Sequence, residues 1–144
     1  MRAGEIVFTG MDRVTFGRPA AEAVAEAAER LGAKRVFILA SATLNRKTDV
    51  VAGIAEALGP AYAGVHDDMP GHSPRDAVVA CANAARAAGC DLLLSVGGGS
   101  TTDGGKAVTL CLEHGISDPD GLEPFRTVVD EITGKRTFPD YRAP

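Results

Sequence analysis

The sequence lacks an excess of basic residues, a long apolar run and an apolar leader. Its 15 lysines and arginines are outnumbered by 19 aspartates and glutamates, so a formal net charge of −4 provides no basic field for nucleic acid or an anionic membrane. No segment approaches the roughly 18 consecutive apolar residues of a membrane span. Residues 1–10 lack the apolar core of a signal peptide. We therefore expect a protein that binds neither nucleic acid nor membrane.

Cysteine is scarce as well. The three cysteines, Cys81, Cys90 and Cys111, are odd in number, and their spacing matches no zinc or redox motif. We interpret them as small buried thiols in a reducing cytoplasm. The remaining composition, 45% hydrophobic and 24% charged, is typical of a globular domain.

Four segments carry the start and stop signals of helices. Ser73 is expected to cap one of them, with a proline behind it. A glycine ends each segment, and these glycines lie 27, 30 and 26 residues apart. The predicted helices lie within residues 18–32, 45–60, 73–89 and 101–115.

Short apolar runs at residues 35–40, 61–65 and 91–96 separate these helices. They are nearly continuous, as is typical of strands buried on both faces. Alternating strands and helices predict an α/β fold, an open, mostly parallel, Rossmann-like sheet with helices on both faces. Residues 5–10 and 13–17 are expected to form an edge hairpin.

The alternation stops after Gly115. Residues 116–144 hold four of the eight prolines and no clear strand, although residues 121–132 predict a short helix. We therefore divide the chain into an α/β domain, residues 1–115, and a connecting segment, residues 116–144. The sheet looks cut short before its last strand.

Gly97, Gly98 and Gly99 stand where the third apolar run gives way to a helix. Backbone without side chains at that junction, next to the positive end of a helix dipole, favours a bound phosphate or pyrophosphate. The nucleotide P-loop pattern fails because Ser100 occupies the position of its first glycine. The fingerprint G-x-G-x-x-G fails because the next glycine is Gly104.

A third pattern, G-G-G-S-x-x-D-x-x-K, fits residues 97–106. Together with the segments upstream, it resembles the N-terminal dinucleotide-binding domain of the iron-containing (group III) alcohol dehydrogenase family. That family shares its fold with dehydroquinate synthase and glycerol dehydrogenase. The resemblance implies that residues 1–115 bind NAD or NADP. It also implies an oxidoreductase that transfers hydride between this cofactor and an alcohol, aldehyde or ketone.

The resemblance implies a role for each motif residue. The glycines and Ser100 would hold the pyrophosphate, and Asp103 and Lys106 would lie toward the nicotinamide. The predicted cofactor-binding residues are Ser41, Thr43, Gly97, Gly98, Gly99, Ser100, Asp103 and Lys106.

Ser41 departs from the family pattern. Many members carry an aspartate there, which bonds the adenosine ribose and repels a 2′-phosphate. Ser41 removes that repulsion, so NADP is permitted, and Arg46 and Lys47 are close enough in sequence to assist a phosphate.

The family binds its catalytic metal, Fe2+ or Zn2+, through an aspartate and three histidines in a C-terminal helical domain. The resemblance places that domain beyond Pro144, so we expect no catalytic or metal-binding residue in this chain and no dehydrogenase activity from it alone. Homodimers are expected from family habit and from the open sheet edge.

Local alternatives remain open. Ser100 and Asp103 have the spacing of a capping box, and Asp103 and Lys106 that of an ordinary helix pair. Ser41 can be a plain polar turn residue. A loop metal site would use His66, Asp67, Asp68 and His72.

Functional alternatives remain open too. The run His72-Ser73-Pro74 is similar to the maleylacetate reductase branch, from which Asp103 departs. A stand-alone nucleotide-binding module, a lyase related to dehydroquinate synthase and a non-functional truncation are the other readings.

Overall fold

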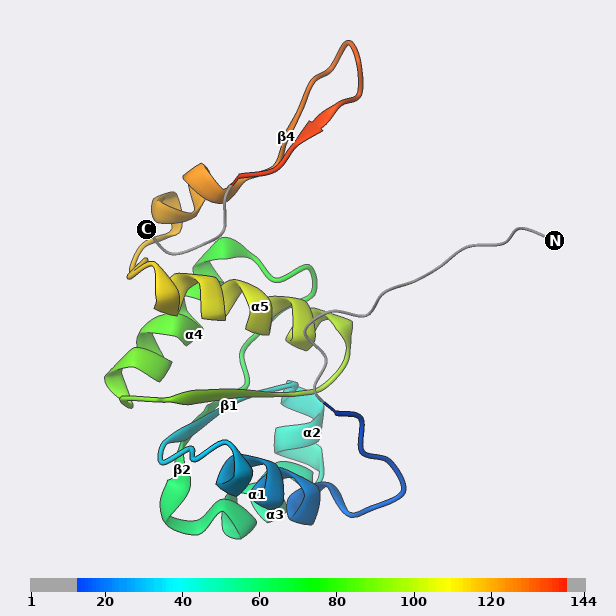
Figure 1. Ribbon diagram of the computed structural model, residues 1–144, viewed down its shortest axis with the longest axis vertical. Helices are drawn as coiled ribbons and strands as arrows, with labels where there is room; N and C mark the ends of the chain where they lie inside the picture. Colours follow the sequence, from blue (N-terminus) through cyan, green and yellow to red (C-terminus); the bar gives the residue numbers. More distant parts are fainter. Residues whose placement is uncertain (1–12, 140–144) are drawn as a thin grey trace, which may run out of the picture.

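A parallel three-stranded sheet lies between two helical layers (Figure 1) in the computed structural model, which describes residues 13–139. The strand order is β2-β1-β3. The strands are β1 (Val36–Ala40), β2 (Tyr62–His66) and β3 (Leu92–Val96). The helices are α1 (Ala20–Arg30), α2 (Ala42–Lys47), α3 (Val50–Leu58), α4 (Arg75–Ala87) and α5 (Gly99–Glu113).

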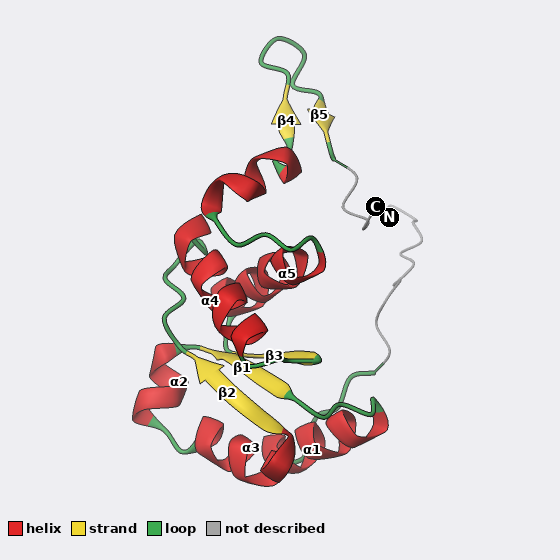
Figure 2. Ribbon diagram, turned by 90° about the vertical axis from the view of Figure 1, so that its left-hand side faces the viewer, coloured by secondary structure: helices red, strands yellow, loops and turns green. Residues whose placement is uncertain are grey.

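Helices α1, α2 and α3 cover one face of the sheet, and α4 and α5 cover the other (Figure 2). The chain passes from β1 to β2 through α2 and α3, and from β2 to β3 through α4. The predicted α/β fold, with a parallel sheet and helices on both faces, is therefore confirmed. No helix within residues 13–139 is long and apolar enough to cross a membrane.

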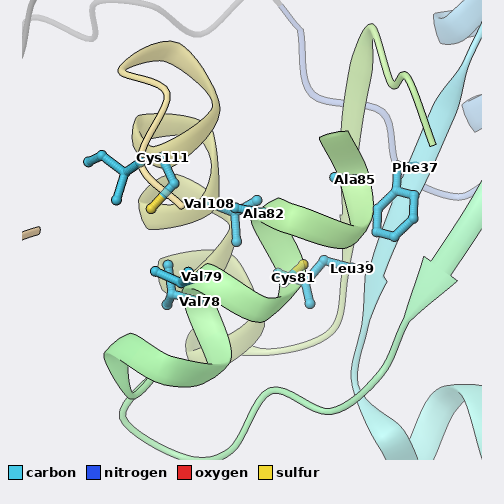
Figure 3. Close-up of a cluster of buried hydrophobic side chains, with 10 residues drawn as sticks. Phe37, Leu39, Val78, Val79, Cys81, Ala82, Ala85, Val108 and Cys111 are labelled. Carbon is cyan, nitrogen blue, oxygen red and sulfur yellow. The ribbon is translucent and has the colours of Figure 1, made fainter. Parts of the chain in front are cut away.

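Strand β1 organises the core because all five of its residues are buried. Phe37 and Leu39 point toward α4 and α5, where they join Cys81 and Cys111 in one apolar cluster (Figure 3). The alternate residues, Val36, Ile38 and Ala40, pack against α1 and α3 on the other face. A fully buried aliphatic side chain of this kind contributes about 2 kcal/mol to folding.

The prediction of buried thiols is confirmed for two of the three cysteines. Cys81 and Cys111 are buried and Cys90 is half-buried, and all three are free. Burial raises the pKa of the Cys81 thiol to about 12, so it is an unreactive core group.

The helix predicted within residues 45–60 is in fact two helices. Thr48, in an extended conformation, ends α2, and its hydroxyl donates to the carbonyl of Leu44. The same hydroxyl accepts from the N–H of Val50 at the start of α3. A threonine that satisfies both helix ends therefore breaks an otherwise helical pattern.

Two predictions about loops also need correction. Residues 13–17 form no strand, and residues 5–10 lie outside the described residues, so the edge hairpin is not observed. Ser73 does not cap α4, whose N-cap is Pro74. The Ser73 hydroxyl instead donates to the carbonyl oxygen of Ser100, 2.9 Å away.

The short helix predicted over residues 121–132 is present only in its first part, because the chain enters an unpredicted hairpin from residue 128. The 3-10 helix η2 spans Pro119–Phe125, and strands β4 (Val128–Val129) and β5 (Arg136–Thr137) pair antiparallel. The hairpin projects away from the layered body (Figures 1 and 2). Asp130 shapes its turn, because its carboxylate accepts from the N–H groups of Ile132 and Thr133.

Candidate functional site at the carboxyl edge of the sheet

The carboxyl ends of β1 and β3 form a topological switch point. The chain leaves β1 toward the layer of α2 and leaves β3 toward the layer of α5, on opposite faces of the sheet (Figure 2). Open α/β sheets bind ligands in the crevice that such divergent connections create. The glycine loop after β3 and Ser41 after β1 lie at this switch point.

Ser41 and Gly97 lie next to each other at this edge. The N–H of Ser41 donates to the carbonyl of Val96 at 2.9 Å. A Cβ placed on Gly97 would lie 2.9 Å from Cβ of Thr101 and 3.2 Å from Cβ of Ser41. Packing within the protein therefore excludes a side chain at Gly97. The Ser41 hydroxyl accepts from the N–H of Leu44, so it also caps α2.

Gly98 and Gly99 differ from Gly97. A Cβ on either residue would meet no atom within 4 Å. Gly98 has φ −93° and ψ −160°, a conformation that any residue adopts. Neither packing nor backbone strain requires glycine at these two positions, but close approach of a ligand would.

The beginning of α5 offers unsatisfied N–H groups to this open space. Gly98 is the N-cap of this helix, and no side chain caps it. The N–H groups of a first helical turn have no partner inside the helix, and they attract anions. The capping-box alternative is wrong, because Ser100 is the second residue of the helix rather than its cap.

The next two glycines of the helix are explained by packing. A Cβ on Gly104 would lie 3.1 Å from the side chain of Met69, which belongs to the loop after β2. A Cβ on Gly105 would overlap the hydroxyl of Ser95 on β3. Both glycines are buried, so they let α5 approach the sheet and the loop closely.

Asp103 and Lys106 form an ion pair on the outer side of α5. Lys106 Nζ lies 3.1 Å from Asp103 Oδ1, and the two side chains are 74% and 71% exposed. A pair this exposed contributes a few tenths of a kcal/mol at most, so both groups can turn to a ligand at little cost. Thr43 is likewise exposed, on α2.

A second cluster joins α2 to the end of β2. Arg46 Nε and Nη2 donate to the two carboxylate oxygens of Asp67 at 2.7 and 2.8 Å. Asn45 Nδ2 donates to the same carboxylate at 2.9 Å. These donors, Arg46 first and Asn45 second, hold the pKa of Asp67 at about 2. Arg46, predicted to assist a phosphate, therefore already has an anionic partner.

The sequence suggests a role for Asp67 only as one ligand of a loop metal site. No three His, Cys, Asp or Glu side chains among residues 13–139 gather as a metal site. His66 Nε2 is buried without a hydrogen-bond partner. An acidic residue directly after a strand was the signal for Asp67, but its partner could not be read from the sequence.

The loop between β2 and α4 packs against the first part of α5 through two contacts. Met69 covers Gly104, and the Ser73 hydroxyl bonds the Ser100 carbonyl. His72 and Ser73 have φ of 65° and 45°, values that are uncommon outside glycine. The loop thus brings Asp67 and its neighbours to the same edge as the glycine loop.

Comparison with known proteins agrees with this geometry. The model of the family described as iron-containing alcohol dehydrogenase matches residues 12–137. The chain belongs to the iron-containing alcohol dehydrogenase family. The family predicted from the glycine loop is thereby confirmed.

Maleylacetate reductases are prominent among the relatives. One from Rhizobium sp. (strain MTP-10005) is 42% identical over 102 residues, which cover 71% of this chain and 28% of that protein. Maleylacetate reductase 2 of Cupriavidus pinatubonensis is 39% identical over 104 residues, covering 72% and 28%. The crystal structure of maleylacetate reductase from Agrobacterium tumefaciens matches with a TM-score of 0.66 and 28% identity, covering 94% of this chain and 39% of that one. This chain therefore spans 28% of the length of these curated relatives.

Proposed function

We propose that this chain is the NAD(P)-binding part of an oxidoreductase that interconverts an alcohol and an aldehyde or ketone. The observation that carries the proposal is the open space beside Gly98 and Gly99. That space lies at the start of a helix of 15 residues and at a topological switch point. Family membership supplies the class of cofactor.

In this proposal, the residues of the chain bind the dinucleotide and orient its parts. The backbone of Gly98 and Gly99, with Ser100, holds the pyrophosphate. Asp103 and Lys106 lie toward the nicotinamide end, and Ser41 toward the adenosine ribose. Gly97 shapes the turn, and Thr43 completes the site on α2. A bound nicotinamide supplies the hydride acceptor or donor.

The domain division follows from the same proposal. Residues 1–115 form the cofactor domain, and residues 116–144 lead toward the remainder of a longer enzyme. By the family resemblance, the catalytic Fe2+ or Zn2+ would be bound by that remainder. We expect a dimer in the cytoplasm and a small alcohol or aldehyde as the substrate.

Reduction of maleylacetate is the second candidate. Its support is the 42% and 39% identity to two maleylacetate reductases, together with the run His72-Ser73-Pro74. The two candidates share the cofactor site and differ in substrate. Assays of a longer chain, with maleylacetate and with simple alcohols, would separate them.

Titration with NADH and NADPH tests the cofactor site. Nicotinamide fluorescence can follow binding directly, because the chain has no tryptophan to interfere. We expect saturable binding, weakened roughly tenfold or more by Gly98→Ala, because the added methyl group stands where the pyrophosphate would approach. The matched control is Gly53→Ala on α3, where a Cβ also meets no atom within 4 Å.

The two variants distinguish a site from a general effect. Gly53→Ala should leave both dissociation constants unchanged. A folded chain that binds neither coenzyme, or equal binding by Gly98→Ala and the native chain, would overturn the proposed site. Circular dichroism confirms folding in each case.

A further inference from the structure

Arg46 and Asp67 join the ends of two neighbouring strands through a two-point ion pair. Both carboxylate oxygens of Asp67 accept from the guanidinium, at 2.7 and 2.8 Å. The Asp67 side chain is 18% exposed and that of Arg46 is 60% exposed, so the carboxylate is sheltered while the guanidinium faces solvent. Arginine makes fork geometry of this kind with carboxylates and with phosphates.

The pair lies at the edge where the proposed cofactor site lies. Strands β1 and β2 are in register through Leu39 and His66, so Ser41 and Asp67 both lie within two residues of the last paired position. Neighbouring strands are about 4.8 Å apart, so the two residues are close neighbours at the carboxyl edge. The strand order β3, β1, β2 puts the glycine loop, Ser41 and Asp67 in one row.

The positions along this row correspond to successive parts of a bound dinucleotide. In the proposed cofactor site, the pyrophosphate is held at the glycine loop after β3 and the adenosine ribose lies near Ser41, over β1 and toward β2. Ser41 carries no charge, so it neither repels nor attracts a 2′-phosphate. The charges next along the row are those of Arg46 and Asp67, and they cancel each other.

Two further charged residues directly follow the members of the pair in the sequence. Asp68 follows Asp67, and its carboxylate acts on Arg46 through space. Lys47 follows Arg46 on α2 and supplies a charge of opposite sign. His66 lies within the sheet, and its Nε2 is buried.

We propose that the Arg46–Asp67 pair sets the choice between NADH and NADPH by keeping the 2′ end of the adenosine site electrically balanced, so that both coenzymes bind. This inference rests on the proposed cofactor site. Loss of the carboxylate frees a guanidinium, which favours the 2′-phosphate of NADPH. Loss of the guanidinium leaves a carboxylate, which accepts a hydrogen bond from the 2′-hydroxyl of NADH and repels the phosphate.

The test measures the dissociation constants of NADH and NADPH for the 144-residue chain and two variants. Asp67→Asn keeps the side-chain volume and should shift the ratio of the constants toward NADPH roughly tenfold, the size of one charge-assisted hydrogen bond. Arg46→Gln should shift the ratio toward NADH by a similar factor. Circular dichroism checks that each variant folds. If only one variant folds, the direction of the shift in its ratio still tests the inference.

Matched controls come from another ion pair. Arg18 and Glu26, joined at 2.8 Å on the layer of α1, allow Arg18→Gln and Glu26→Gln, which alter net charge by the same amounts. Opposite shifts from Asp67→Asn and Arg46→Gln, with control ratios within a factor of two of the native value, would support the inference. Unchanged ratios, or shifts in the same direction, would overturn it. Failure of the native chain to bind either coenzyme would overturn the proposed function as well, and this result is distinct from an unchanged ratio.

Discussion

At the scale of single residues, the three glycines of the loop after β3 differ in what surrounds them. Gly97 is enclosed by Thr101 and Ser41, whereas Gly98 and Gly99 border open space. The sequence identifies the run of glycines and its position between strand and helix. It could not separate the three positions, because the neighbours of Gly97 come from β1 and from the helix that follows.

This difference predicts that two alanine substitutions have different effects on stability. Gly97→Ala should lower the free energy of unfolding by about 1–3 kcal/mol, because the new methyl group overlaps Thr101. Gly98→Ala meets no atom and should change that free energy by less than about 0.5 kcal/mol. Urea unfolding followed by circular dichroism measures both. Equal stability of the two variants would contradict the assignment of Gly97 to packing.

At the scale of elements, the sequence predicts the regular part of the fold well. The apolar run of β1 is continuous because both faces of this strand are covered, and α4 and α5 end at the glycines expected of them. The break at Thr48 was missed because a threonine hydroxyl can bond either neighbouring turn. The hairpin of β4 and β5 was missed because each strand has only two residues, too few for a pattern.

The local sequence pattern predicts the candidate site only where its residues are close in sequence, and Ser41 and Thr43 were predicted through the family resemblance instead. Residues 97–106 carry their own motif, and the structure brings Ser41 beside them. The bond between Arg46 and Asp67 spans 21 positions, and it depends on the register of β1 and β2. No local pattern in the sequence specifies such a register.

The contact between α2 and β2 predicts a pH dependence of stability. Arg46 and Asn45 lower the folded-state pKa of Asp67 from 3.8 to about 2. A lowered folded-state pKa stabilises the protein above the unfolded-state pKa, and that stabilisation is lost as the pH falls through the folded-state value. The native chain should therefore lose stability between about pH 4 and pH 2.

Asp67→Asn should flatten this part of the profile, because asparagine does not titrate. Urea unfolding at several pH values for both proteins measures the two slopes. Glu26→Gln, in the exposed pair on α1, is the control for a general loss of carboxylate. Identical slopes for the native chain and Asp67→Asn would show that the Asp67 carboxylate is not held by its partners at low pH.

At the scale of the whole molecule, β2 and β3 are the two edge strands of the sheet within residues 13–139, and the β3 edge is the one beside an apolar groove. Within residues 13–139, β3 pairs only with β1. An apolar groove runs beside it, lined by Val24 and Leu31 of the α1 side and by Leu92 and Leu94 of β3. Leu31 is 57% exposed, so this groove is a place where further polypeptide can bury apolar surface.

The groove predicts the effect of lengthening the chain. A chain extended beyond Pro144 toward the length of its relatives should be more stable than the 144-residue chain by roughly 2 kcal/mol or more, since covering Leu92 and Leu94 buries one or two aliphatic side chains. Urea unfolding of both chains measures the difference. Leu94→Asp is the informative variant, because a charge in the groove should abolish most of the gain in the extended chain. If extension adds no stability, or if Leu94→Asp destabilises both chains equally, the groove is an ordinary surface and the added polypeptide does not pack there.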